Sequence, residues 1–312
     1  MITDSATIQL PTKSTVAGLL CALLFTLIYI TQFSSSANAA EAQLIYADAK
    51  VIEVASNFGF LEGPVADQLG NLFFTDINNN TVHKMTASGQ ILPAYSPSNY
   101  ANGLAIDLDG SLLICEQSGQ RISKLAADGS VSTVVSRYAG KPFNSPNDLW
   151  VHPNGSIYFT DPRYNFPAGK ISQEGEYVYL ISQDRSRVEP VIIDIPKPNG
   201  VVGTEDGKTL YIASTELRKV FRFDISPNGY LVNKIEFADQ GSDGMTLDQQ
   251  GNVYLTWVGG VSVRNPEGEE IEFIRTPQMP ANVGFGGADG KTLFMTARTS
   301  LYSIKMNVTA SR

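Results

Sequence analysis

Residues 102–114 read NGLAIDLDGSLLI, in which an apolar alternating stretch runs into an Asp-Gly turn and a second β-rich stretch follows. This pattern predicts a β-hairpin, because Asp-Gly favours the tight turn that joins two antiparallel strands. The pattern occurs six times, with its turn glycines at Gly70, Gly110, Gly155, Gly207, Gly251 and Gly290. A spacing of roughly 40 to 50 residues is typical of folds that repeat one supersecondary unit.

Each repeat supplies four strands, since a third strand-like stretch follows every hairpin and a fourth usually comes after a second glycine-bearing turn. The sixth repeat ends without a fourth strand, while an unassigned strand-like stretch, residues 50–55, precedes the first repeat. A ring that takes its missing outer strand from the N-terminus leaves no exposed sheet edge. We therefore predict an all-β fold, a six-bladed β-propeller closed by an N-terminal strand that completes the last blade. The alternative is an open β-sandwich with repeated hairpins.

The N-terminal segment, residues 1–39, differs in kind from the rest of the chain. Lys13 precedes an apolar run from residue 16 to residue 30, and Ala37-Asn38-Ala39 follows. The run is shorter than the roughly 20 apolar residues needed to cross a bilayer, so it indicates a secretory signal more than a membrane span. We expect residues 1–39 to be a cleaved signal peptide and residues 40–312 to be a secreted or periplasmic propeller domain without a stable membrane span. A retained N-terminal anchor is the alternative.

Composition narrows the possible partners. Without residues 1–39 the chain keeps 22 basic and 30 acidic residues, a net charge of −8, which argues against nucleic acid as a partner. Cys115 is then the only cysteine, so no intramolecular disulfide can form, and its place on a predicted second strand indicates a small buried residue.

One side-chain position carries oxygen in all six repeats. It lies eight residues before each turn glycine and holds Glu62, Asn102, Asn147, Asn199, Asp243 and Asn282. The first strand of each propeller blade lines the central channel, so the shared offset predicts that these side chains converge on the axis. Carboxylate and amide oxygens suit a hard cation such as Ca²⁺, which takes about 6 to 8 oxygen ligands. The alternative is that Asn and Asp at strand starts bond only nearby backbone, beside the glycines that follow several of them.

The residues needed for other chemistries are scarce. The two histidines, His83 and His152, lie at peripheral positions of the predicted blades, which argues against zinc and against a Ser-His-Asp or Cys-His arrangement. No glycine-rich phosphate loop of standard spacing is present. A calcium ion acting as a Lewis acid remains, with a carboxylate to take the proton of a water. Six residues after the first three turn glycines lie further carboxylates, either supports of the oxygen ring or solvated strand ends: Asp76, Glu116 and Asp161.

Several segments form one set along the chain. They are residues 61–64 (LEGP), 143–148 (FNSPND), 152–162 (HPNGSIYFTDP), 198–200 (PNG), 242–245 (SDGM) and 285–287 (FGG). In this order they resemble the SMP-30/gluconolactonase family over nearly the whole chain after residue 57. The resemblance implies a six-bladed propeller with a catalytic divalent ion, usually calcium, in a family that includes sugar lactonases and related organophosphate hydrolases.

The resemblance also implies roles for individual positions. The family's metal-ligand pattern falls on Glu62, Asn147, Asn199 and Asp243, and Asp243 matches the residue usually given the general-base role. Animal members carry an arginine that touches sugar hydroxyls two residues before the position of Asn147, where this chain has Ser145. The chain therefore departs from that mode of sugar recognition.

Four residues are candidate substrate contacts. Asn102 and Asn282 belong to the oxygen ring, and Arg163 and Tyr164 begin a loop, residues 163–169, at the predicted channel mouth. A surface loop without a role is the alternative for that segment.

Together these patterns predict a secreted hydrolase that opens a small-molecule lactone with Ca²⁺, Mg²⁺ or Mn²⁺ in the channel and Asp243 as general base. The rival hypotheses are a calcium-dependent phosphotriesterase, a non-catalytic propeller that binds ligands or proteins through its face, and a propeller whose ion is purely structural.

Overall fold

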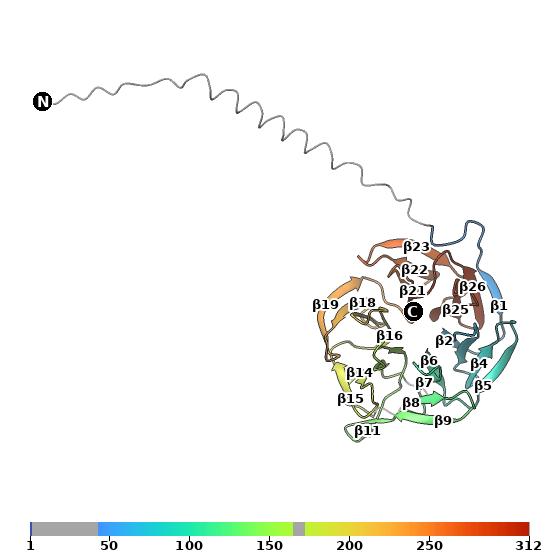
Figure 1. The fold of residues 1–312 in the computed structure, drawn as a ribbon, viewed down its shortest axis with the longest axis horizontal. Coiled ribbons are helices and arrows are strands. Elements are labelled where there is room, and N and C mark those ends of the chain that lie inside the picture. The colour runs from blue at the N-terminus through green and yellow to red at the C-terminus, as the bar shows by residue number, and fades with distance from the viewer. Residues whose placement is uncertain (2–42, 165–171, 312) are drawn as a thin grey trace. The chain divides into compact units, whose positions relative to one another are not determined.

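The computed structural model describes residue 1, residues 43–164 and residues 172–311 of the chain. Residues Leu44–Arg312 form one compact unit, in which six antiparallel four-stranded sheets surround a common axis (Figure 1). The prediction of a six-bladed β-propeller is confirmed. In the described ranges the regular elements are all strands, and no helix there is long and apolar enough to cross a membrane. The predicted signal peptide lies outside the described residues, apart from Met1.

The blades follow one another along the chain, and the first strand of each lies nearest the axis (Figure 1). Blade 1 holds β2 (Leu61–Ala66), β3 (Leu72–Asp76), β4 (Thr81–Met85) and β5 (Ile91–Tyr95). Blade 2 holds β6 (Ala101–Ile106), β7 (Leu112–Glu116), β8 (Arg121–Leu125) and β9 (Val131–Val135). Blade 3 holds β12 (Leu149–Val151), β13 (Ile157–Asp161), β14 (Tyr177–Ile181) and β15 (Val188–Ile192), preceded by a hairpin of β10 (Arg137–Tyr138) and β11 (Lys141–Pro142).

The second half of the ring repeats this plan. Blade 4 holds β16 (Pro198–Gly203), β17 (Thr209–Ser214), β18 (Lys219–Ile225) and β19 (Leu231–Ala238). Blade 5 holds β20 (Met245–Leu247), β21 (Val253–Trp257), β22 (Gly260–Arg264) and β23 (Glu270–Arg275). Blade 6 holds β24 (Asn282–Gly286), β25 (Thr292–Ala297), β26 (Ser300–Lys305) and, as its outer strand, β1 (Ile52–Ala55).

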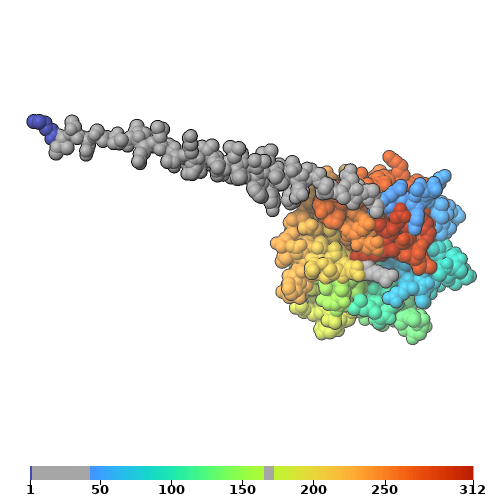
Figure 2. Space-filling view, turned by 45° about the horizontal axis from the view of Figure 1, so that its top comes forward, coloured from blue at the N-terminus to red at the C-terminus, as the bar shows by residue number. Residues whose placement is uncertain are grey.

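The ring closes where the two ends of the propeller meet. Strand β1 pairs antiparallel with β26, with Ile52 opposite Ser303 and Glu53 opposite Tyr302. Figure 2 shows the first and last segments of the propeller, blue and red, side by side on its surface. The predicted displaced strand is therefore present, although it begins at Ile52 rather than at residue 50.

The repeated hairpins depend on the conformation of their glycines. All six turn glycines have positive φ, between 65° and 92°. A residue with a Cβ atom rarely adopts this left-handed conformation, whereas glycine does so readily. The turn signal in the sequence thus has a direct backbone cause.

The apolar core lies between neighbouring blades. One cluster joins Cys115 of blade 2 to Leu149, Phe159 and Tyr179 of blade 3, with Phe143 between them. Cys115 is fully buried and unpaired, as expected for a small core residue. Because each blade stacks its apolar faces on both neighbours, the first strands are held at a fixed distance from the axis.

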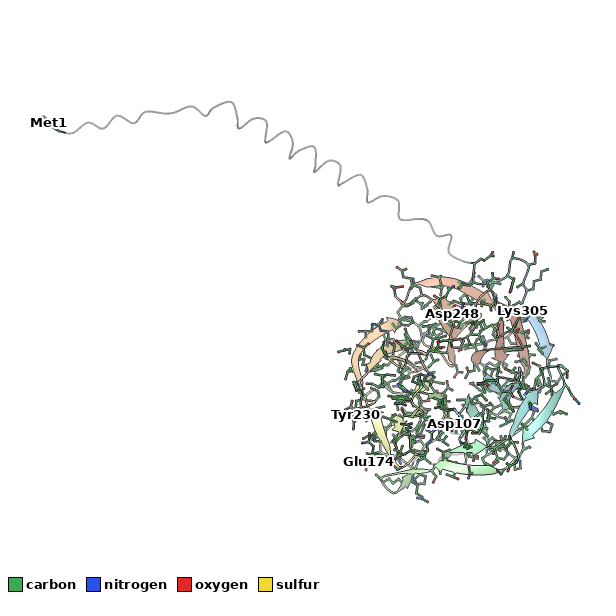
Figure 3. The ribbon with its side chains drawn as sticks, viewed as in Figure 1. Met1, Asp107, Glu174, Tyr230, Asp248 and Lys305 are labelled. Atoms are coloured by element: carbon green, nitrogen blue, oxygen red, sulfur yellow. The ribbon has the colours of Figure 1, made fainter. Side chains whose placement is uncertain are left out.

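Polar contacts reinforce the end of the propeller that carries the hairpin turns. Asp107 of blade 2 accepts hydrogen bonds from Arg185 Nη2 of blade 3 at 2.9 Å and from Lys124 Nζ at 3.3 Å (Figure 3). Asp248 of blade 5 accepts hydrogen bonds from the backbone of Gln250 and Asn252. These carboxylates fix turns and blade spacing.

Candidate active site

The six residues of the predicted oxygen ring lie at the start of the innermost strands. Glu62, Asn102, Asn199 and Asn282 belong to β2, β6, β16 and β24, while Asn147 and Asp243 come two residues before β12 and β20. Five of the side chains are only 4–7% exposed, and Asp243 is half-buried. The shared sequence offset therefore corresponds to a shared level in the structure, because every blade starts its first strand at the same end.

Close backbone contacts between neighbouring first strands hold this level together. A Cβ atom added to Gly63 would lie 2.4 Å from the carbonyl oxygen of Asn102, and one added to Gly103 would lie 2.6 Å from that of Asn147. A Cβ atom added to Gly200 would lie 2.5 Å from the carbonyl oxygen of Asp243, whereas one added to Gly244 would lie 2.0 Å from the side-chain Cγ of Asn282. The glycines that follow ring residues thus permit close packing around the axis.

Blade 3 lacks this glycine and uses a carboxylate instead. Asp148 follows Asn147, is buried, and accepts hydrogen bonds from the backbone N–H groups of Leu149 at 2.9 Å and Val201 at 3.3 Å. The second bond crosses to blade 4. Burial raises the pKa of Asp148 to about 7, although the two backbone hydrogen bonds favour the ionised form.

The carboxylates at the ends of the second strands support the ring from behind. Asp161 is fully buried and accepts hydrogen bonds from the backbone of Asn144 and Ser145, both at 2.8 Å. Asp76 holds the backbone of Gly59 and Phe60 in the same way, at 2.9 and 3.1 Å. In both blades the two bonded N–H groups come two and three residues before a ring residue.

Glu116, the third of these carboxylates, is also fully buried, and it pairs with Arg121 at 2.7 Å. The alternative of solvated strand ends is therefore wrong for all three.

Two opposed carboxylates dominate the electrostatics of the ring. Burial raises the pKa of Glu62 well above its usual range, and the nearby charge of Asp243 raises it further. Burial also raises the pKa of Asp243 to about 6, while a hydrogen bond from Asn199 and the positive charge of Arg298 favour its ionised form. A cation between the two carboxylates would remove this repulsion.

Several oxygens of the ring have no donor within the described protein. The side-chain amides of Asn102 and Asn147 are buried and make no hydrogen bond to the described residues. Asn199 uses its Nδ2 for two bonds, to Asp243 Oδ1 at 2.7 Å and to the Tyr164 hydroxyl at 2.8 Å, which leaves its Oδ1 free of described donors. None of these amide atoms is among the fully enclosed side-chain atoms that lack a partner, so they reach open space in which solvent or a ligand can satisfy them.

This donor set fits an oxygen-preferring cation. In residues 43–164 and 172–311 no three or more His, Cys, Asp and Glu side chains form a group that could hold a metal ion. The ring instead offers two carboxylates and several amides, a mixture suited to Ca²⁺ and unsuited to zinc.

The sequence comparison bears on this geometry. Residues 60–299 match the family described as the SMP-30/gluconolactonase/LRE-like region. The chain belongs to this family. The matched range contains all six blades' first strands and every residue of the oxygen ring.

Relatives in the SMP-30/gluconolactonase family include two bacterial lactonases. A gluconolactonase of Zymomonas mobilis is 29% identical over 88% of this chain and 85% of its own length. The lactonase drp35 of Staphylococcus saprophyticus is 26% identical over 72% of both chains.

Solved structures of similar proteins share the propeller. A gluconolactonase from Xanthomonas campestris has a TM-score of 0.81 and 27% identity, covering 86% of this chain and 93% of its own. A calcium-binding protein, regucalcin, from Agrobacterium tumefaciens has a TM-score of 0.71 and 20% identity, covering 86% and 97%. At the latter identity the likeness shows the fold alone.

The predicted substrate contacts occupy different places around this family's ring. The Asn282 amide lies beside Glu62 and favours its ionised form, and its Oδ1 accepts the N–H of Val283 at 2.8 Å. Tyr164 touches Asn199 directly. The Arg163 guanidinium instead donates to the carbonyl oxygen of Gln173 at 2.7 Å. The rest of the predicted mouth loop, residues 165–169, lies outside the described residues.

Three residues at the site were not singled out by the sequence. Thr75 and Thr160 donate to the carbonyl oxygens of Asn102 and Asn199 in the next blade, at 3.0 and 2.8 Å. The sequence pattern that could have revealed these two threonines is the Thr-Asp pair repeated in β3 and β13. Arg298 is exposed in a turn and lies over the Phe60 ring, 5.3 Å from its centroid; a single surface arginine offers no comparable pattern.

Other described parts of the molecule do not compete with the ring as a catalytic site. His83, on β4, stacks on Phe74 with the two ring centroids 5.3 Å apart. His152 donates from Nε2 to the Gly207 carbonyl oxygen at 3.0 Å. A surface hollow of about 590 Å³ is lined by residues such as Asp206 and Gln250 at the opposite, turn-bearing end. None of these groups reaches the six ring oxygens.

Proposed function

We propose that the protein is a metal-dependent hydrolase that opens the ring of a sugar lactone. Membership of the family and the lactonase names of relatives at 26–29% identity support this reaction class. The observation that carries the proposal is the ring itself, where the charge of Asp243 raises the pKa of the buried Glu62 carboxyl and the amides of Asn102 and Asn147 make no hydrogen bond to the described residues. Such a ring suits a divalent cation better than it suits a protein or peptide ligand.

The proposed metal ligands are Glu62, Asn147, Asn199 and Asp243, with Ca²⁺ as the first choice and Mg²⁺ or Mn²⁺ as alternatives. A divalent ion bound there supplies Lewis-acid polarisation of the lactone carbonyl. The ligand charges balance a divalent ion, since Glu62 and Asp243 contribute one negative charge each and the amides none.

Asp243 has the properties of a general base in this arrangement. In the metal-free protein burial raises its pKa to about 6, so its carboxylate is mostly ionised at neutral pH. A bound cation would lower this pKa. The Asn199 amide donates a hydrogen bond to Asp243 Oδ1 at 2.7 Å and fixes the orientation of the Asp243 carboxylate. The second oxygen, Oδ2, is then free to accept the proton of a water that attacks the carbonyl. Asn102, whose amide has no described partner, is positioned to donate to a substrate hydroxyl.

The direct test is acid release from a panel of aldonolactones by the purified protein after chelator treatment, with and without added Ca²⁺. We expect hydrolysis that is lost with chelator and restored by calcium. Asp243→Asn should lower kcat by about 100-fold or more while the melting temperature in chelator stays near that of the unmodified protein. An Asp243→Asn variant as active as the parent would refute the role of this residue. Hydrolysis of phosphotriesters but of no lactone would favour the phosphotriesterase alternative.

We also propose that residues 1–39 export the protein to the periplasm or the medium. N-terminal sequencing of the mature protein should begin at Ala40. A chain that retains Met1 and stays with the membrane fraction would contradict this part of the proposal.

A further inference from the structure

A chain of hydrogen bonds runs from the edge of the ring to Asp243. Asn199 Nδ2 lies 2.7 Å from Asp243 Oδ1 and 2.8 Å from the Tyr164 hydroxyl. That hydroxyl lies 3.2 Å from Thr215 Oγ1, and Thr215 Oγ1 lies 3.4 Å from the Lys197 carbonyl oxygen. Four side chains and one carbonyl group are thus connected in one line.

The direction of every bond in this line is fixed by its two ends. The Lys197 carbonyl can only accept, so Thr215 donates to it and must accept from Tyr164. The Tyr164 hydroxyl then has its proton engaged and accepts from Asn199 Nδ2. At the other end the ionised Asp243 can only accept, so it takes the second proton of the same NH₂ group.

Both protons of the Asn199 amide are therefore used, and the amide cannot rotate without losing two hydrogen bonds. A half-turn would place its carbonyl oxygen against the Asp243 carboxylate and its NH₂ group toward the ring. In the observed orientation Oδ1 is the only polar atom of the amide without a described partner. This atom is the one that can bind a cation, whereas an NH₂ group would repel it.

We infer that Tyr164 is a positioning residue for the metal site: its hydroxyl fixes the Asn199 amide so that Oδ1 faces the cation. This inference rests on the proposed function, because the cation is the one proposed there. It differs from a substrate contact, since the hydroxyl already donates to Thr215 and accepts from Asn199.

The Tyr164 ring is itself held in place. The backbone N–H of Tyr164 lies 3.2 Å from Ser145 Oγ. The Lys197 ammonium lies over the Tyr164 ring, 5.3 Å from the ring centroid. The Lys197 ammonium in turn pairs with Glu176 at 3.0 Å. The hydroxyl is therefore presented to Asn199 from a fixed support, as residues behind metal ligands usually are.

The test compares Tyr164→Phe with Tyr230→Phe in the full-length protein after chelator treatment. Tyr230 is the matched control, because its hydroxyl also makes a hydrogen bond, to Glu189 Oε2 at 3.0 Å, but at the outer edge of blade 4 (Figure 3). Calorimetric titration with Ca²⁺ measures Kd, thermal melting in chelator measures the fold, and lactone hydrolysis at saturating Ca²⁺ separates kcat from KM.

We expect Tyr164→Phe to raise the Kd for Ca²⁺ about 10-fold or more, as is usual for residues that orient metal ligands, with a melting temperature in chelator close to that of Tyr230→Phe. Thr215→Val removes the acceptor of the tyrosine proton and should give a smaller increase in the same direction. Tyr230→Phe should leave Kd unchanged.

Three results would overturn the inference. The first is a Kd of Tyr164→Phe within twofold of the parent, and the second is a raised lactone KM with an unchanged Kd for Ca²⁺, which would make Tyr164 a substrate contact. In the third, the parent itself binds none of Ca²⁺, Mg²⁺ and Mn²⁺, and the proposed function fails together with the inference. The first two leave the proposed function intact.

Discussion

Calcium binding to the ring should weaken steeply as the pH falls from 7 to 5. Metal ligands must be ionised to bind, so a proton on Asp243 competes with the cation. The pKa of Asp243 in the metal-free protein is about 6. The apparent Kd rises with the factor 1 + 10^(pKa − pH), which is about 1 at pH 7 and about 11 at pH 5. Asp243 alone therefore predicts a loss of affinity of about tenfold.

Glu62 makes the expected dependence steeper still. Burial and the charge of Asp243 both raise the pKa of Glu62. Binding of the cation therefore releases protons from both carboxylates. Titrations at pH 5, 6, 7 and 8 in buffers of different protonation enthalpy measure both Kd and the number of protons released. At pH 6 Asp243 is about half protonated, so at least about half a proton should leave for each Ca²⁺ bound.

Two variants show whether the dependence belongs to the ring. Asp243→Asn should bind more weakly at all pH values and lose the share of the pH dependence that Asp243 causes. Asp128→Asn removes an exposed carboxylate in the turn before β9 and should behave as the parent. A Kd that stays within twofold between pH 5 and pH 7, with no proton release, would rule out competition between protons and Ca²⁺ at the ring, because it would mean that the carboxylates of the ring do not bind the cation.

Other contacts lead to three further predictions. Arg298→Gln removes a charge that lowers the pKa of Asp243, so the Ca²⁺ affinity of this variant should begin to fall at a higher pH than in the parent. The control Arg137→Gln changes an exposed residue of β10 and should not shift the curve. Gly103→Ala places a Cβ 2.6 Å from the Asn147 carbonyl oxygen and should lower the free energy of unfolding by about 1–3 kcal/mol in urea titrations; an unchanged midpoint would contradict the close packing of first strands. Burial raises the pKa of Asp161 to about 8. Because the folded pKa lies above the unfolded one, the melting temperature in chelator should fall as the pH rises from about 5 to 8. A melting temperature that rises over this pH range would contradict the prediction.

The repeat, the hairpins and the candidate ligands could be predicted because each depends on short-range features of the chain. The glycine of each turn needs a left-handed conformation, and β-rich apolar stretches stand on both sides of it, so the period of the repeat is visible in the residues themselves. The fixed offset from turn glycine to ring residue follows from the length of one strand. Residues 50–55 could be assigned to the last blade because an open ring would leave an unpaired edge.

The supporting contacts could not be predicted because they join residues of different blades. Thr75 of blade 1 meets the carbonyl of Asn102 in blade 2, and Arg298, near the end of the chain, approaches Phe60, near the start of the propeller. The role of the glycines after the ring residues was open for the same reason. Their local sequence fits a turn, while their actual neighbours are the first strands of the adjoining blades.

The residues alone indicate that six similar units form a propeller and that six oxygen-bearing side chains lie at one level, since both follow from local geometry repeated along the chain. Which of these oxygens remain free, and which carboxylates are hard to ionise, is known only from the folded ring. Those properties depend on burial and on distances between blades, such as the 2.7 Å between Asn199 and Asp243, and these are set when the ring closes.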